Sequence, residues 1–284
     1  MFEWLTKPLT YEFMQRGLLA STLVGVLCAV VGCYVVLRGM AFLGDALAHA
    51  ILPGVALAYL FNGNLLIGAL VAALVVALLI AFLSRQGTIK EDTAIGILFA
   101  AALSLGVVLI SSIRTYAVDL THILFGNVLG VSSEDLIFTA ALGAVVLGFI
   151  VVFYREFLVM SFDPVLAATL RMRAERFRAL MLILLALTVV VSMQTVGVGL
   201  VAAMLVTPGA AAYLLTRRLT SMMIVAALIG ALSSVVGLYL SFYLSVASGA
   251  AVVLTATAIF LLAFLFAPAR GLVPRWRHTR AETA

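Results

Sequence analysis

Two ionisable residues, Asp45 and His49, lie four positions apart inside a long apolar segment. Residues at i and i+4 share one face of an α-helix, so the carboxylate and the imidazole are predicted to point the same way. Carboxylate oxygens suit manganese, and imidazole suits zinc, iron and related metals, so this pair could bind a divalent transition-metal ion. The alternatives are a hydrogen-bonded pair that only holds the helix in place and a proton relay. Two ligands make a weak site, and a two-fold dimer with this face on its axis would supply four.

The composition sets the environment of this pair. The chain has 284 residues, of which 65% are hydrophobic and 10% charged, and its mean hydropathy is +1.27. A soluble domain has about 45–50% apolar and about 25% charged residues. We therefore predict an all-α polytopic membrane protein with about 8–9 transmembrane helices, built as a single transmembrane domain over residues 1–284. Long continuous apolar runs, rather than short alternating ones, argue against a membrane β-barrel.

Nine apolar runs are candidate membrane crossings, each of which needs roughly 20 residues. They cover residues 18–37, 42–60, 65–83, 94–111, 135–154, 179–193, 200–215, 223–244 and 249–266. Arginines gather in residues 155–178, after the seventh run, and in the tail 267–284, so the positive-inside rule places these parts and the C-terminus in the cytoplasm. Nine crossings leave the N-terminus outside, and a re-entrant 119–130 would change that number. The net charge of +5 fits this topological role better than nucleic-acid binding.

The polar stretch 155–178 is the longest between the apolar runs. Asp163 followed by Pro164 suits the start of a helix, with Asp163 as N-cap, and Arg171, Arg173 and Arg176 follow. This helix could dock on a soluble cytoplasmic partner. The alternative is a solvated loop whose arginines only set the topology.

Two Pro-Gly pairs interrupt apolar runs, Pro53-Gly54 in the second and Pro208-Gly209 in the seventh. Such pairs can break a membrane helix and allow gating movements, although close helix packing is the simpler interpretation. Cys28 and Cys33 lie five positions apart, which suits neither a zinc knuckle nor a redox pair, so we expect free buried thiols.

Several catalytic motifs are absent from the sequence. It contains no G-x-x-x-x-G-K-[ST] phosphate loop, no H-E-x-x-H and no G-x-S-x-G. The chain is therefore not expected to be an enzyme. Energy for active transport would have to come from a partner protein or from an ion gradient.

Six segments can be compared with known proteins: residues 34–56, which include GDALAH at 44–49, and residues 90–96, 126–129, 194–197, 206–216 and 262–268. In these segments the chain resembles the permeases of manganese, zinc and iron ABC importers, and most closely the branch for manganese or chelated iron. These segments occur in order over nearly the whole chain, and the family's in-membrane Asp and His fall on Asp45 and His49. Family members have about eight membrane helices, one fewer than the nine apolar runs.

The resemblance implies a set of partners in a bacterial inner membrane. They are a second permease subunit, identical or closely related, a cytoplasmic ABC ATPase dimer and an extracytoplasmic metal-binding protein. The cargo would be Mn²⁺, or else Zn²⁺ or Fe²⁺, with no permanently bound cofactor, and residues 163–178 would face the ATPase. The competing hypotheses are a stand-alone proton-coupled secondary metal transporter and a membrane scaffold or sensor.

Overall fold

The computed structural model describes residues 6–85, 89–112, 128–162 and 173–267. Every regular element in these ranges is a helix, and nine segments are long and apolar enough to cross a membrane. In chain order the elements are η1 (Pro8–Thr10), α2 (Glu12–Leu37), α3 (Leu43–Ala50), α4 (Leu52–Leu60), α5 (Leu65–Leu83), α6 (Glu91–Ser111), η2 (Val128–Gly130), α8 (Ser133–Val152), α9 (Tyr154–Phe162), α11 (Ala174–Val196), α12 (Val198–Leu215), α13 (Leu219–Leu244) and α14 (Ser248–Phe266). The all-α, polytopic prediction is confirmed, with α3 and α4 together forming one of the nine segments.

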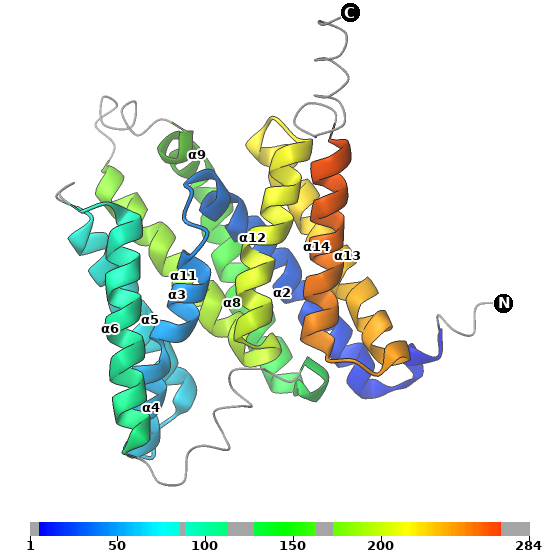
Figure 1. Ribbon diagram of the computed structural model, residues 1–284, viewed down its shortest axis with the longest axis horizontal. Coiled ribbons are helices and arrows are strands. Elements are labelled where there is room, and N and C mark those ends of the chain that lie inside the picture. Colours follow the sequence, from blue (N-terminus) through cyan, green and yellow to red (C-terminus); the bar gives the residue numbers. More distant parts are fainter. Residues whose placement is uncertain (1–5, 86–88, 113–127, 163–172, 268–284) are drawn as a thin grey trace, which may run out of the picture.

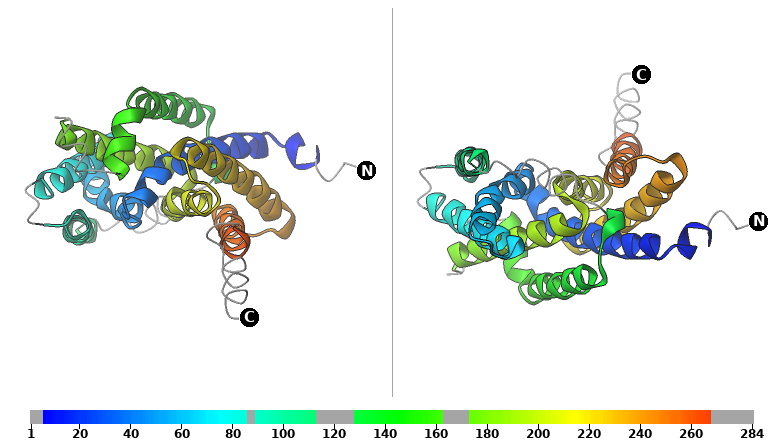
Figure 2. Two further views of the ribbon diagram at one scale, coloured as in Figure 1. Left: turned by 90° about the horizontal axis from the view of Figure 1, so that it is seen from above. Right: turned by 90° about the horizontal axis from the view of Figure 1, so that it is seen from below.

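The central helix of the bundle is α2, which crosses the molecule diagonally in Figure 1. In its most apolar window 72% of the residues are buried, compared with 17% for α6 and 22% for α8 and α14. Helices α8, α11, α12 and α13 all pack on it. Seen from above and below, α8 and α14 lie on opposite sides of the bundle (Figure 2). The outer helices therefore present their apolar side chains to lipid, while α2 is enclosed by protein.

Glycines allow α2 to approach its neighbours closely. A Cβ atom on Gly32 would lie 1.7 Å from the carbonyl oxygen of Leu205 in α12. Gly25 and Gly230 face each other in the same way, with α2 and α13 almost in backbone contact. Because lipid tails are as apolar as the helices, such close van der Waals packing is what holds membrane helices together.

Side-chain caps fix the beginnings of two helices. The Asn64 side chain accepts hydrogen bonds from the backbone N–H groups of Leu66 and Ile67 at the start of α5. At the start of α8, Ser132 and Asp135 form a reciprocal capping box. Caps of this kind satisfy N–H groups that have no partner within the helix.

The helices differ from the predicted runs mainly at their polar ends. The sixth was expected to begin at residue 179, yet α11 begins at Ala174 and includes Arg176 and Arg178. Part of the polar stretch that follows the fifth run is also helical, as α9. Hydropathy identifies the lipid-facing part of a helix but does not detect its polar extension, which accounts for both differences.

The two Pro-Gly pairs behave differently. The chain leaves the helix at Ile51, and Pro53 stands in the first turn of α4, where its missing N–H is tolerated. Helix α12, in contrast, runs without interruption through Pro208 from Val198 to Leu215, so the break predicted there is not seen. The second apolar segment is therefore divided into α3 and α4, whereas the seventh is continuous.

Polar contacts join four helices at one end of the bundle. Arg38, after α2, lies 3.0 Å from Glu91 of α6. Arg85, after α5, lies 2.6 Å from Glu175 of α11. Arg178 of α11 donates a hydrogen bond of 3.2 Å from Nη1 to the Ser84 carbonyl oxygen. These contacts tie the end of α2 to α6 and the end of α5 to α11.

Candidate functional site: the Asp45–His49 face of α3

The short helix α3 is held in place by the face opposite to Asp45 and His49. Leu43 and Leu47 are fully buried, and a Cβ atom on Gly44 would lie 2.8 Å from Cδ1 of Leu205 in α12. The chain reaches α3 through a turn at Gly39, whose φ of 68° favours glycine. With its apolar face against α11 and α12, α3 must turn its two ionisable side chains away from the core.

The carboxylate and the imidazole lie side by side, as their spacing predicts. His49 Nε2 lies 3.6 Å from Asp45 Oδ1, which is longer than a hydrogen bond. The side chains of Asp45 and His49 are 48% and 29% exposed. The His49 ring also makes an edge contact with Phe99 of α6, with centroids 6.0 Å apart. The two groups therefore do not close a hydrogen bond with each other, and both are accessible to a third atom.

Both side chains line a large cavity. It has a volume of about 650 Å³ and lies between α3, the junction of α11 with α12, and the start of α14. Apart from Asp45 and His49, its lining residues are small or apolar: Val196, Val198, Gly199, Leu200, Gly249, Ala250, Val253 and Leu254. Among these lining residues, only Asp45 and His49 of α3 could coordinate a cation through a carboxylate or an imidazole.

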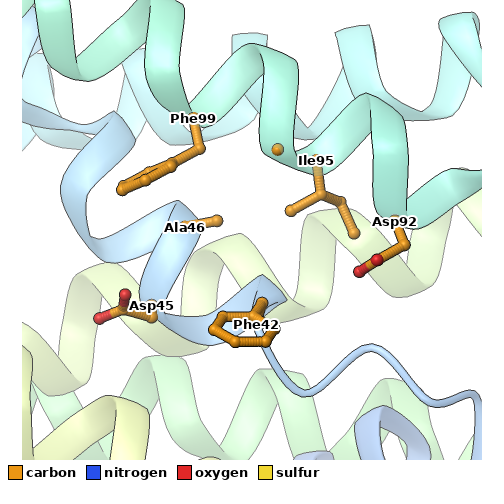
Figure 3. A pocket seen from close by; sticks show the side chains of 7 residues that line it. Phe42, Asp45, Ala46, Asp92, Ile95 and Phe99 are labelled. Atoms are coloured by element: carbon orange, nitrogen blue, oxygen red, sulfur yellow. The ribbon is translucent and has the colours of Figure 1, made fainter.

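Asp45 also lines a second, smaller cavity of about 200 Å³ between α3 and α6 (Figure 3). The other residues around it are Phe42, Ala46, Asp92, Ile95, Gly96 and Phe99. In Figure 3 the Asp92 carboxylate points toward the space beside Phe42, and the Asp45 carboxylate turns to the other side of α3.

The pair supplies only two of the ligands that a bound metal ion needs. Within the described residues, no group of three or more His, Cys, Asp or Glu side chains could hold a metal ion. A carboxylate oxygen and one imidazole nitrogen suit Mn²⁺, Fe²⁺ or Zn²⁺, and further ligands would come from water or from a second subunit. An incomplete ligand set is appropriate for an ion that must be released again.

The segment predicted to face a soluble partner is described only in part. Asp163, Pro164 and Arg171 lie outside the described residues, as do residues 268–284 of the tail. Arg173 is the N-cap residue of α11, and Arg176 is in the first turn of that helix; both are exposed. These two arginines therefore lie at the end of the bundle where the polar contacts join α2, α5, α6 and α11.

The glycines of the two Pro-Gly pairs are at helix contacts. A Cβ atom on Gly54 would lie 2.1 Å from the carbonyl oxygen of Gly68 in α5, and one on Gly209 would lie 3.2 Å from the Gly32 carbonyl oxygen. This geometry favours the interpretation that these glycines serve close helix packing.

Sequence reasoning assigned no role to several residues that surround the site. Asp92 and Phe99 on α6 face α3, and Arg38 fixes the chain before α3 through Glu91. Their positions depend on which face of α6 meets α3, and hydropathy carries no such information. The one available signal was the run of charged residues 90–92 directly before an apolar segment.

Known proteins similar to this chain point to a single family. The "Manganese transport system membrane protein MntC" of Halalkalibacterium halodurans is 49% identical over 275 residues, which cover 96% of this chain and 94% of that protein. A Haemophilus influenzae membrane protein named for iron transport is 42% identical over 270 residues, covering 95% and 99%. Among solved structures, "PsaBC from Streptococcus pneumoniae in complex with Fab" superposes with a TM-score of 0.84 at 39% identity, covering 98% of this chain and 99% of that one.

The family description itself spans almost the whole chain. Residues 10–267 match the ABC 3 transport family, a range that begins before α2 and ends after α14. The match therefore includes all nine apolar helical segments and the face of α3 that carries Asp45 and His49. This multi-pass membrane protein belongs to the ABC 3 transport family.

Proposed function

We propose that this chain is the transmembrane permease of an ATP-driven importer of divalent transition-metal ions, and that Mn²⁺ is its cargo. The observation that carries the proposal is the half-exposed Asp45–His49 pair, set between two cavities in a segment that is otherwise apolar. Ionisable groups at membrane depth are costly, and they are retained where ions pass. The relatives named for manganese transport support the choice of metal.

The permease acts with partners in this proposal. A second permease subunit, a copy or a close relative, places its own Asp–His pair opposite the first and so completes four ligands around the ion. A separate cytoplasmic ABC ATPase dimer supplies the energy, since this sequence has no phosphate loop. An extracytoplasmic binding protein delivers the ion. The chain lies in a bacterial inner membrane with its C-terminus in the cytoplasm.

The parts of the chain have separate roles in the cycle. The ion passes from the delivery protein into the large cavity and is held by Asp45 and His49. ATP binding closes the ATPase dimer, and residues 163–178, which include Asp163, Pro164, Arg171, Arg173 and Arg176, carry the movement to α11. Through the contact of Arg178 with Ser84, movement of α11 reaches α5.

The experiment is reconstitution of the purified permease with and without its ATPase in liposomes. We expect ATP-dependent uptake of Mn²⁺ by the full complex, and none by the permease alone. Uptake by the permease alone, driven by a proton gradient, would instead identify a secondary transporter. A complex that assembles yet moves no Mn²⁺, Fe²⁺ or Zn²⁺ under any condition would contradict the proposal and favour a scaffold or sensor.

A further inference from the structure

Asp45 is the one residue, within the described chain, that the linings of the two cavities share. The larger cavity is bounded by the first turns of α12 and α14, and the smaller by the first turns of α6. Helix α6 begins at the end of the bundle where Arg38 meets Glu91, while α14 begins at the opposite end (Figure 1). The two cavities therefore approach Asp45 from opposite ends of the molecule.

We propose that the cation leaves the Asp45–His49 pair through the smaller cavity between α3 and α6, with Asp92 as the next side chain that it meets. This inference rests on the proposed function and adds the route by which the ion leaves. Arginines gather at the end of the bundle where α6 begins, so the positive-inside rule places this end, and the smaller cavity with it, toward the cytoplasm. The larger cavity is then the route by which the ion arrives.

Charge distribution in the first turn of α6 supports this role for Asp92. Its neighbour Glu91 is paired with Arg38 at 3.0 Å, so that carboxylate is already neutralised. Within the described residues Asp92 has no hydrogen bond or ion pair, and its carboxylate points into the smaller cavity (Figure 3). A carboxylate at this position lowers the energy of a cation between the apolar walls of this cavity.

The transfer requires only a small movement at Asp45. In Figure 3 its carboxylate lies on the side of α3 away from Asp92. Exposed side chains change rotamer rapidly, so a turn of this carboxylate toward α6 moves a bound cation from one cavity to the other. His49, which lines only the larger cavity, does not follow, and the cation is thereby released from the imidazole ligand of the same subunit.

Three glycines provide a matched test of the route. A Cβ atom on Gly96, Gly199 or Gly148 would meet no atom within 4 Å, so leucine fits at each without a clash of its Cβ atom. Gly96 lines the smaller cavity, Gly199 the larger one, and Gly148 lies exposed on α8 away from both. Gly96→Leu therefore obstructs the proposed exit and Gly199→Leu the arrival route, while Gly148→Leu is the control.

Each variant is tested in the full complex with its ATPase, for Mn²⁺ binding without nucleotide and for ATP-driven Mn²⁺ uptake into liposomes. We expect Gly96→Leu to bind Mn²⁺ normally while uptake falls about tenfold, a barrier increase near 1.4 kcal/mol. Gly199→Leu should reduce both binding and uptake, and Gly148→Leu neither. Normal uptake by Gly96→Leu would overturn the exit route alone, whereas absence of uptake in the unmodified complex would contradict the proposed function itself.

A second pair of variants tests Asp92 directly and does not depend on how leucine packs. Asp92→Asn should slow uptake and leave Mn²⁺ binding unchanged, and Asp92→Glu, which keeps the charge, should restore uptake. Equal uptake by Asp92→Asn and the unmodified complex would remove Asp92 from the route. A loss of binding in Asp92→Asn would also contradict the inference, because it would place this carboxylate in the binding site rather than beyond it.

Discussion

The guanidinium of Arg38, directly after α2, lies 3.0 Å from the carboxylate of Glu91, the first residue of α6. The two side chains are only 12% and 18% exposed. Burial lowers the pKa of Arg38, and the nearby charge of Glu91 opposes that shift. An arginine remains protonated in proteins even so. This ion pair therefore anchors the chain before α3 to α6, and it bears on how firmly Asp45 is placed.

Removal of one partner of this ion pair should destabilise the protein. Glu91→Gln leaves the charge of Arg38 poorly solvated and without its counter-ion, at a cost of about 1–3 kcal/mol. The double variant Arg38→Met/Glu91→Met removes both charges and should recover much of that loss. The midpoint of thermal denaturation in detergent is the measurement. A midpoint for Glu91→Gln equal to that of the unmodified protein would show that the pairing contributes nothing.

The Asp45–His49 pair should be needed for metal binding and dispensable for assembly. Asp45→Asn removes the negative charge of one ligand and His49→Ala removes the imidazole, and we expect Mn²⁺ affinity and uptake to fall by at least about tenfold, or 1.4 kcal/mol. Neither side chain is in the core, so co-purification with the ATPase should persist. Glu134→Gln, an exposed carboxylate change in the first turn of α8, is the control. Normal uptake in both site variants would refute the assignment.

Glycine at the crossing of α2 and α12 should tolerate substitution in proportion to the space around it. Gly32→Ala places a methyl group 1.7 Å from a backbone carbonyl oxygen, so the helices must separate. Gly209→Ala, with 3.2 Å to the Gly32 backbone, requires a much smaller adjustment. Gly148→Ala meets no atom and should gain a few tenths to about 1 kcal/mol of helix propensity. The thermal midpoint should be lowest for Gly32→Ala, intermediate for Gly209→Ala and highest for Gly148→Ala. Unchanged stability of Gly32→Ala would contradict the packing of α2.

The two cysteines should be inert in the folded protein. Cys28 and Cys33 are completely buried, and Cys28 Sγ donates a hydrogen bond to Ser192 Oγ at 3.4 Å. A maleimide reagent should label neither thiol until the protein is denatured, because reaction requires an accessible thiolate. Labelling is followed by mass shift with and without denaturant. Rapid labelling of the native protein would show that α2 is more exposed than the structure has it.

Much of this fold is present in the local sequence. The nine apolar runs predicted the nine helical segments, because a bilayer imposes both the length and the polarity of each crossing. The adjacency of Asp45 and His49 followed from helical periodicity alone. Polar ends were misjudged, as at α11, because hydropathy does not separate a helical extension from a loop.

The residues that surround Asp45 and His49 could not be predicted from the sequence. The interruption at Ile51, the edge contact of His49 with Phe99, and the position of Asp92 beside the α3–α6 cavity all depend on contacts between distant helix faces. The predicted break at Pro208 did not occur: α12 continues through this residue and packs on α2 and α14.

The enclosure of α2 has a consequence for biosynthesis. Helix α2 leaves the ribosome before the helices that pack on it: Ser234 of α13, which donates a hydrogen bond to the Ser21 carbonyl oxygen, follows 213 residues later. At roughly 5–20 residues per second, α2 waits about 10–40 s for that contact. Throughout this interval its glycine-lined surfaces face lipid or the insertion machinery, so the nascent chain must be kept from associating with other newly made helices until its own C-terminal half arrives.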